Sequence, residues 1–320
     1  MRMCLGRLVL AAIVSMVAGN LAAGEDAPPW AYVANPPGLT PPADDGIPRR
    51  VPGSTHAFTL TQIRDLYSPP DWRPTEHPPM PRVVGQGRNP GVYACGYCHL
   101  PNGLGRPENA SVAGLPTAYI VQQMVDFKSG ARKSSAPHLL PQALMMGVAA
   151  AASDEEVRTA AAYFSNLKLK PWIKVIETDV VAKTQVMGWM LVETGAGTEP
   201  IGQRIIEMPQ NLERTELRDD TSGFIAYVPT GSIRQGEVLV TTGADGKTVP
   251  CTICHGLDLR GIGPIPPLAG RSPSYIVRQL YDIQHGTRNG AWVELMKPAV
   301  AQLTLEDMIA ISAYTASRAP

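Results

Sequence analysis

Cys251-Thr252-Ile253-Cys254-His255 repeats the pattern of an earlier pentapeptide, Cys95-Gly96-Tyr97-Cys98-His99. In each, two thiols lie one helical turn apart, so both can add to the vinyl groups of one haem while the adjacent imidazole binds the iron. A single Cys-x-x-Cys pair also fits half of a zinc site or a thioredoxin-like redox pair. The surrounding sequence has to distinguish these alternatives.

The N-terminus has the features of a secretory signal peptide, which we expect to span residues 1–23. Arg2 and Arg7 precede an apolar run over residues 8–17, and small residues follow it. The mature protein is therefore expected to begin near Gly24 and to be exported, with no transmembrane segment after signal removal.

The distribution of cysteines points to covalent haem. Of the five cysteines in the chain, Cys4 lies in the predicted signal peptide and the other four lie in the two pentapeptides, so none is left for a structural disulfide. An oxidising compartment would convert a bare pair to a disulfide, and attachment to haem prevents this. We therefore predict two covalently attached c-type haems. The residues expected to hold them are Cys95, Cys98, His99, Cys251, Cys254 and His255.

An internal repeat surrounds the pentapeptides. Residues 119–132 begin 21 positions after Cys98, residues 275–288 begin 21 positions after Cys254, and seven of their fourteen positions are identical. Both segments have the apolar spacing of an amphipathic helix, with a proline in front and a glycine near the end. Each repeat then closes with a second predicted helix, whose first residues have the pattern of a capping box.

Three polar residues recur at matched positions of the repeated helix. One role open to them is to bond the haem propionates or the loop that carries the second axial ligand. The simpler interpretation is that a duplicated helix keeps the same packing residues. The pairs are Tyr119 and Tyr275, Gln123 and Gln279, and Arg132 and Arg288.

Each haem iron is expected to take a second axial ligand, and a methionine thioether is the usual choice in electron-transfer sites. In the second repeat the candidate is Met296, which lies in a predicted loop eight residues before Thr304. Its nearby rival, Met308, lies inside a predicted helix. An alternative role for Met296 is ordinary apolar packing.

The first repeat has a less certain ligand. Counting back the same eight residues from Ser153 gives Met145, which we take as the metal ligand. Met146 is adjacent to it, and His138 falls within a five-residue insertion, so both remain open as alternatives.

Two further segments differ in composition from the repeats. Residues 24–83 include fourteen prolines, which exclude a continuous helix, and their aromatic side chains favour an arm packed on the folded parts over a disordered lead. One short helix is expected over residues 60–67. Residues 169–231 contain four β-prone runs separated by turn-formers and predict a small linker module. The runs are residues 173–181, 186–192, 204–208 and 224–228.

The order of these motifs resembles class I cytochromes c, and their duplication resembles the diheme members of that class. The resemblance covers residues 84–168 and 232–318. It implies a mainly α fold with two haem domains in tandem, 84–168 and 232–320, joined by the β-containing module. It also implies periplasmic location and one-electron transfer.

The expected function is therefore that of a periplasmic electron carrier with His/Met-ligated haems and no catalytic residues. Its expected partners are a redox donor and acceptor, such as a dehydrogenase or a terminal oxidase. One alternative is a diheme peroxidase, which needs an iron with an open or displaceable ligand position and a nearby acid–base residue. Another is the cytochrome subunit of a periplasmic dehydrogenase complex. Equal numbers of basic and acidic residues, 28 of each, give no indication of nucleic-acid binding.

Overall fold

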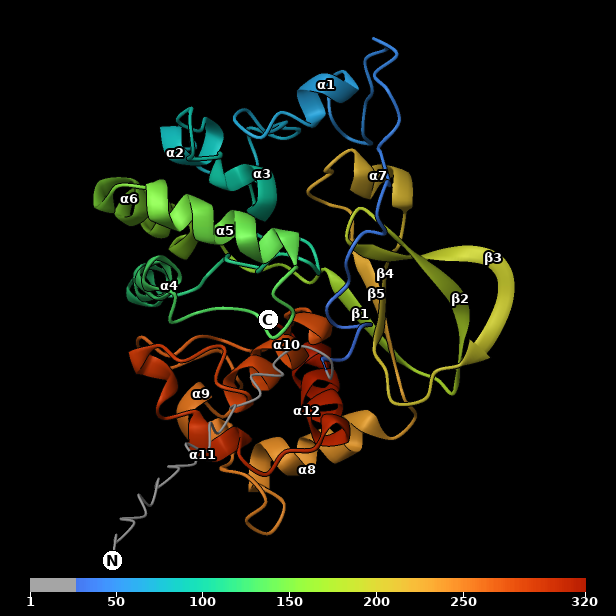
Figure 1. Cartoon of the computed structure of the whole chain (residues 1–320), viewed down its shortest axis with the longest axis vertical. Coiled ribbons are helices and arrows are strands. Elements are labelled where there is room, and N and C mark those ends of the chain that lie inside the picture. Colours follow the sequence, from blue (N-terminus) through green and yellow to red (C-terminus); the bar gives the residue numbers. More distant parts are fainter. Residues whose placement is uncertain (1–26) are drawn as a thin grey trace, which may run out of the picture.

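The computed structural model describes residues 27–320, and the predicted signal peptide lies outside them. The described chain contains a first helical unit, a middle module with the strands, and a second helical unit (Figure 1). In Figure 1 the first unit lies above the second, and the strands lie to one side of both. The predicted mainly α fold with a small β-containing module is confirmed. Within residues 27–320, no helix has the length and apolar character needed to cross a membrane.

Five helices form the first unit: α2 (Arg82–Gly85), α3 (Cys95–His99), α4 (Thr117–Ser129), α5 (Leu140–Ala151) and α6 (Asp154–Ser165). The repeated helix α4 ends at Gly130, whose φ of 75° is the left-handed conformation common at helix ends. Ser153 and Glu156 form the predicted capping box of α6. The sequence did not predict α5.

The second unit has six helical segments: α8 (Ser232–Thr242), α9 (Thr252–His255), α10 (Pro273–Gln284), the 3-10 helix η1 (Ala291–Val293), α11 (Lys297–Val300) and α12 (Leu305–Ser317). Thr304 and Asp307 form the predicted capping box of α12. Gly231 occupies the N-cap of α8 with a φ of 90°, and the first-turn N–H of Ile233 donates to Glu177 Oε1 at 2.8 Å. A side chain of the middle module thus accepts a hydrogen bond from a backbone N–H in the first turn of α8.

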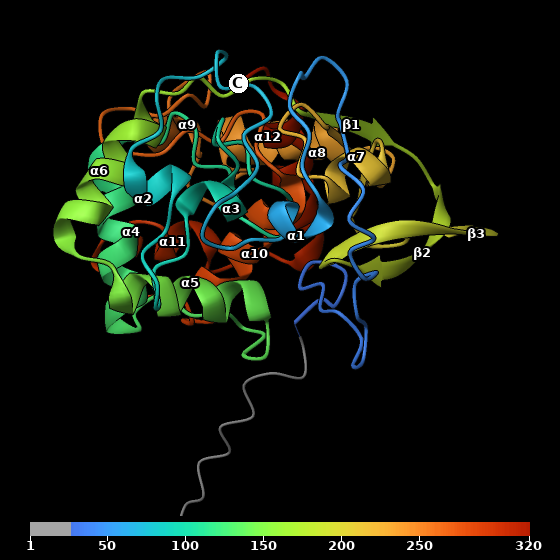
Figure 2. The same ribbon diagram turned by 90° about the horizontal axis from the view of Figure 1, so that it is seen from above.

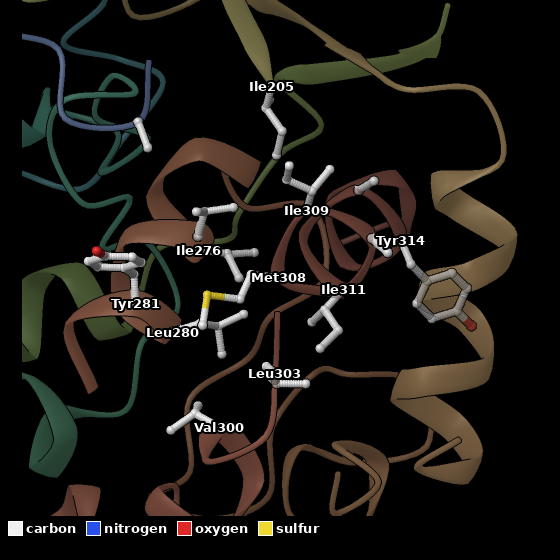
Figure 3. Close-up of a cluster of buried hydrophobic side chains, with 14 of the residues drawn as sticks. Ile205, Ile276, Leu280, Tyr281, Val300, Leu303, Met308, Ile309, Ile311 and Tyr314 are labelled. Atoms are coloured by element: carbon white, nitrogen blue, oxygen red, sulfur yellow. The ribbon is translucent and has the colours of Figure 1, made fainter. Parts of the chain in front are cut away.

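The core of the second unit lies between α10 and α12 (Figure 3). Met308 and Ile309 of α12 are 1% and 2% exposed, and Ile205 of the middle module, which is fully buried, packs with them. Full burial of a side chain of this size contributes about 1.5–3 kcal/mol. The module and the second unit therefore share one core.

Two sheets form the middle module. β1 (Ile173–Glu177), β4 (Ile206–Pro209) and β5 (Phe224–Val228) form a three-stranded sheet in which β5 is central, parallel to β1 and antiparallel to β4. β2 (Val180–Met187) and β3 (Met190–Pro200) form an antiparallel hairpin that projects from the body of the molecule (Figure 2). The helix α7 (Leu212–Glu216) precedes β5. The β-prone run at 173–181 forms two strands, because the chain turns between β1 and β2.

The N-terminal arm packs on the folded parts, as its aromatic residues suggested. Trp72 is 2% exposed and donates from Nε1 to the carbonyl oxygen of Leu217 at 2.9 Å. Tyr32 is buried and donates to Asp282 Oδ1 of the second unit at 2.7 Å. The predicted helix at 60–67 is only α1 (Leu60–Ile63), which packs in the cluster around Trp72 and not in the core of the first unit.

Gly236 of α8 lies where this helix contacts α12. A Cβ atom added at this buried glycine would lie 1.9 Å from the carbonyl oxygen of Ala310. We expect Gly236→Ala to lower the free energy of unfolding by about 2 kcal/mol or more, because the two helices must separate. The control is Glu237, the exposed neighbour of Gly236. Glu237→Ala should change the free energy of unfolding by less than about 0.5 kcal/mol. Denaturant unfolding of both variants checks this, and equal stabilities would contradict the close packing.

Candidate functional site

Both pentapeptides form one short helical turn. α3 contains all five residues of the first, whereas Cys251 is the N-cap of α9 in the second. The residue after each histidine has a positive φ, 62° at Leu100 and 87° at Gly256, with ψ values of 155° and 152°. A positive φ is unfavourable for leucine. The two turns thus end in the same backbone conformation, although only the second has a glycine there.

A backbone carbonyl orients each histidine ring. The distance from His99 Nδ1 to Ala110 O and that from His255 Nδ1 to Pro266 O are both 2.8 Å, and each carbonyl lies eleven residues after its histidine. A carbonyl oxygen only accepts, so Nδ1 carries the proton and Nε2 keeps its lone pair. Burial lowers the pKa of both histidines and favours the same neutral form. A metal-binding imidazole needs this protonation state.

The thiols of the two motifs are half-buried. Burial raises the pKa of Cys95 to about 12 and that of Cys251 to about 11, and it also raises the pKa of Cys98. Such thiols stay protonated at neutral pH, whereas a thioredoxin-like pair needs a lowered pKa. Within residues 27–320, no three His, Cys, Asp or Glu side chains are grouped to hold a metal ion, as a zinc site would require. The donor set therefore fits covalent haem.

The candidate methionine ligands lie after the repeated helices. Met145 and Met146 belong to α5, Met296 is the N-cap of α11, and all three are half-buried. Consecutive residues of an α-helix point about 100° apart, so only one of Met145 and Met146 can face a given site. Met308 is 1% exposed in the core of the second unit (Figure 3), and His138 is exposed.

The recurring tyrosine, glutamine and arginine side chains connect the two units. Arg132 Nη2 of the first unit donates to Tyr275 Oη at 2.9 Å and to Gln279 Oε1 at 3.0 Å, both in the second unit. The backbones of Arg132 and Arg288 pair in an isolated antiparallel bridge. The repeat aligned these positions without indicating that they face one another, so the sequence missed this role.

Arg288 makes the reciprocal contacts. Its Nη2 donates to Tyr119 Oη and to Gln123 Oε1, both at 2.9 Å. Arg132 and Arg288 are buried, with neutral hydrogen-bond partners, and Arg288 Nε has no partner among the described residues. Buried positive charges are costly without negative charge nearby. The buried carboxylate of Asp282 already acts electrostatically on Arg288. A haem propionate would add a carboxylate for the Nε atom that has no partner, so the residues present fit the cofactor.

Arg271 connects the two histidine-orienting segments. Its guanidinium donates to the carbonyl oxygens of Pro267 (2.8 Å) in its own unit and of Ser111 (2.6 Å) and Ala113 (3.0 Å) in the first unit. Ser111 and Pro267 directly follow the residues whose carbonyls accept from the histidines. The sequence missed Arg271 because the first repeat has Leu115 at this position.

No family model matches the chain. The thiosulfate dehydrogenase electron acceptor of Thiomonas intermedia is 27% identical over 234 residues, which cover 72% of this chain and 80% of that protein. Cytochrome c4 of Stutzerimonas stutzeri is 26% identical over 240 residues, 72% of this chain and 86% of that protein. Cytochrome c-554(548) of Halomonas halodenitrificans is 36% identical over 75 residues, 23% of this chain and 90% of that protein.

A duplicated helical unit with a Cys-x-x-Cys-His turn in each copy defines a class of electron-transfer proteins that attach haem covalently. The chain belongs to the c-type cytochromes, as a diheme member built from two class I units. It carries two covalently attached c-type haems, and its function is electron transfer.

The reciprocal contacts between the units predict the effect of removing one hydroxyl. Tyr275→Phe leaves Arg132 with one hydrogen bond fewer, and Tyr119→Phe does the same to Arg288. Each should lower the free energy of unfolding by about 1–3 kcal/mol, because a buried charged donor loses a partner. Chemical denaturation measures this. As a control, Tyr227→Phe should have little effect, because that hydroxyl makes no hydrogen bond within residues 27–320. Equal stability of all three variants would contradict the contact.

Proposed function

We propose that the two Cys-x-x-Cys-His turns are the attachment sites of the haems. One haem is held by Cys95, Cys98 and His99, and the other by Cys251, Cys254 and His255. The observation that carries this assignment is the Nδ1-to-carbonyl contact of each histidine, because it leaves a neutral Nε2 available for iron. Each haem, when bound, supplies one reversible one-electron couple. The protein holds the imidazole, supplies the two cysteines for covalent attachment and joins the units.

The proposed sixth ligands are Met296 in the second unit and Met145 in the first. Met296 is half-buried against the core of its unit, and the N-cap position holds its backbone at the start of α11. Met145 has the matching place in the first repeat, eight residues before the capping serine of α6. A thioether ligand raises the reduction potential relative to a second histidine.

The proposed domains are the two haem domains, 84–168 and 232–320, the linker module 169–231 and the arm 24–83. We propose that the signal peptide at 1–23 directs the chain to the periplasm, where covalent haem protects the cysteine pairs from oxidation. Two relatives are named as electron acceptors of thiosulfate dehydrogenase. This supports a dehydrogenase as the electron donor of this chain.

Substitution of the methionines tests the ligand assignment. In the haem-loaded protein, Met296→Ala should abolish Met ligation at one of the two centres and lower its potential, because a soft thioether is lost. Absorption spectra and a redox titration measure both effects. Met308→Leu is the control in the same unit and should leave both centres unchanged, because it conserves core volume. If Met296→Ala leaves both spectra unchanged, the assignment is wrong.

Met145→Ala and Met146→Ala form a matched pair in the first unit. Only Met145→Ala should change the spectrum of the haem in the first unit, since the side chains of Met145 and Met146 point in different directions from α5. The same spectra measure it, and a change in Met146→Ala alone would move the assignment by one residue. A wild-type protein with one high-spin iron that reacts with peroxide would instead favour the peroxidase alternative.

A further inference from the structure

The corresponding faces of the two motifs differ in their surroundings. Adding 156 to a residue number of the first unit gives its counterpart in the second, as Cys98 corresponds to Cys254. In each unit this face consists of four residues that lie between the cysteines or after them. The matched pairs are Tyr97 and Ile253, Pro101 and Leu257, Asn102 and Asp258, and Arg106 and Ile262.

In the first unit the middle module covers this face at Tyr97. Arg218, which follows α7, donates from Nη1 to the carbonyl oxygen of Tyr97 at 2.7 Å. The same guanidinium lies 3.5 Å from the centroid of the Tyr97 ring. The ring and the carbonyl of Tyr97 together fix the position of the Arg218 guanidinium, so this contact is specific.

Two further residues of the first face bind the module. Arg106 is 6% exposed and donates to the carbonyl oxygens of Thr215 (3.3 Å) and Gly188 (3.4 Å). Asn102 Nδ2 donates to the carbonyl oxygen of Asp220 at 2.5 Å. The covering segment is thus fixed at several points. Polar side chains on the first face and backbone carbonyls of the module match each other as donors and acceptors.

The arm holds the covering segment from its other side. Arg73 Nη1 contacts Asp219 Oδ1 at 2.7 Å and Asp220 Oδ1 at 2.5 Å, and all three side chains are buried. A buried ion pair with this many oxygen partners restricts the segment that carries the acids. The segment that covers the first motif is therefore held in place by contacts with the arm, the middle module and the first unit.

In the second unit the same face is apolar and open. Ile253 is 65% exposed, Leu257 is 93% exposed and Ile262 is 54% exposed. The charged neighbours Asp258 and Arg260 have opposite signs and lie 3.9 Å apart, so they add no net charge. Three large apolar residues this exposed within ten positions of the chain indicate an interaction site. Its chemistry matches an apolar partner surface without net charge.

We propose that the second face, with Ile253, Leu257 and Ile262, is the docking surface for the redox partner protein, and that the middle module closes the equivalent first face. The proposal rests on the haem attachment proposed above. The partner is a one-electron redox protein with an uncharged apolar face. Ile253 lies between the two cysteines of its motif, so a partner docked there is next to the site of electron exchange. One electron passes between the proteins, and no bond forms or breaks.

Closure of the first face gives the two units different roles. Electrons enter and leave through the second unit, and the first unit exchanges them with the second. The units are in direct contact at the arginine pair, which keeps them in one arrangement. The middle module thus determines which end of a duplicated protein meets a partner.

The charge-insertion variant Leu257→Glu/Ile262→Glu tests the docking surface in the full-length, haem-loaded protein. Stopped-flow absorbance follows reduction by a reduced blue-copper protein with an uncharged apolar docking face, and separately by dithionite, which needs no docking. The variant should be reduced at least tenfold more slowly by the blue-copper protein, and within twofold of wild type by dithionite. Val238→Glu, at a 46% exposed position on α8, is the matched control and should behave as wild type.

The outcomes separate the two proposals. An unchanged blue-copper rate in Leu257→Glu/Ile262→Glu, or an equal fall in Val238→Glu, overturns the docking surface. So does a wild-type protein that dithionite reduces but the blue-copper protein does not. A wild-type protein without two covalent haems, or one that dithionite cannot reduce, overturns the attachment sites instead.

Hydroxyl-radical footprinting tests the closure of the first face. In the free haem-loaded protein, residues 253–262 should be labelled strongly and residues 97–106 weakly. Addition of the oxidised blue-copper protein should protect only the second segment. Similar labelling of both segments in the free protein would overturn the closure.

Discussion

The structure depends on how a neutral imidazole is held inside each unit. The Nδ1-to-carbonyl hydrogen bond of His99 and of His255 fixes the ring, and it requires a carbonyl eleven residues further along the chain to return to the motif. The loop between histidine and carbonyl is therefore constrained in both copies. Arg271 extends the constraint, because its one guanidinium binds the residues that directly follow both carbonyls. The two sites are thus built as a pair.

Duplication supplies the interface between the units from a single set of side chains. A tyrosine and a glutamine on the repeated helix, and an arginine that follows it, meet their own copies across an approximate twofold relation, so each arginine is bound by the other unit. Two buried arginines with neutral partners are a favourable arrangement only near negative charge. The cofactor's carboxylates are suited to this place, which makes assembly of the interface and binding of haem mutually supporting.

The middle module breaks this symmetry. It shares the core of the second unit through Ile205, and Arg218 and its neighbours bind the motif of the first. The arm adds Trp72 and Arg73 to the same region. A segment inserted between two similar units can therefore contact them differently, because the units have different residues at matched positions, such as Arg106 in the first and Ile262 in the second.

The sequence by itself determined the cofactor, the repeat and the starts of the closing helices, because these depend on local spacing. The local signals are the Cys-x-x-Cys-His turns, the seven shared positions of the repeated segment and the capping boxes at Ser153 and Thr304. It did not predict α5, nor that Glu177 of a distant strand accepts from the first-turn N–H of Ile233 in α8. Only the tertiary structure decided that the recurring arginines face each other and that the module covers Tyr97 but leaves Ile253 exposed. Contacts of this kind join residues more than a hundred positions apart, and their donors and acceptors are recognised as partners only once the chain has brought them together.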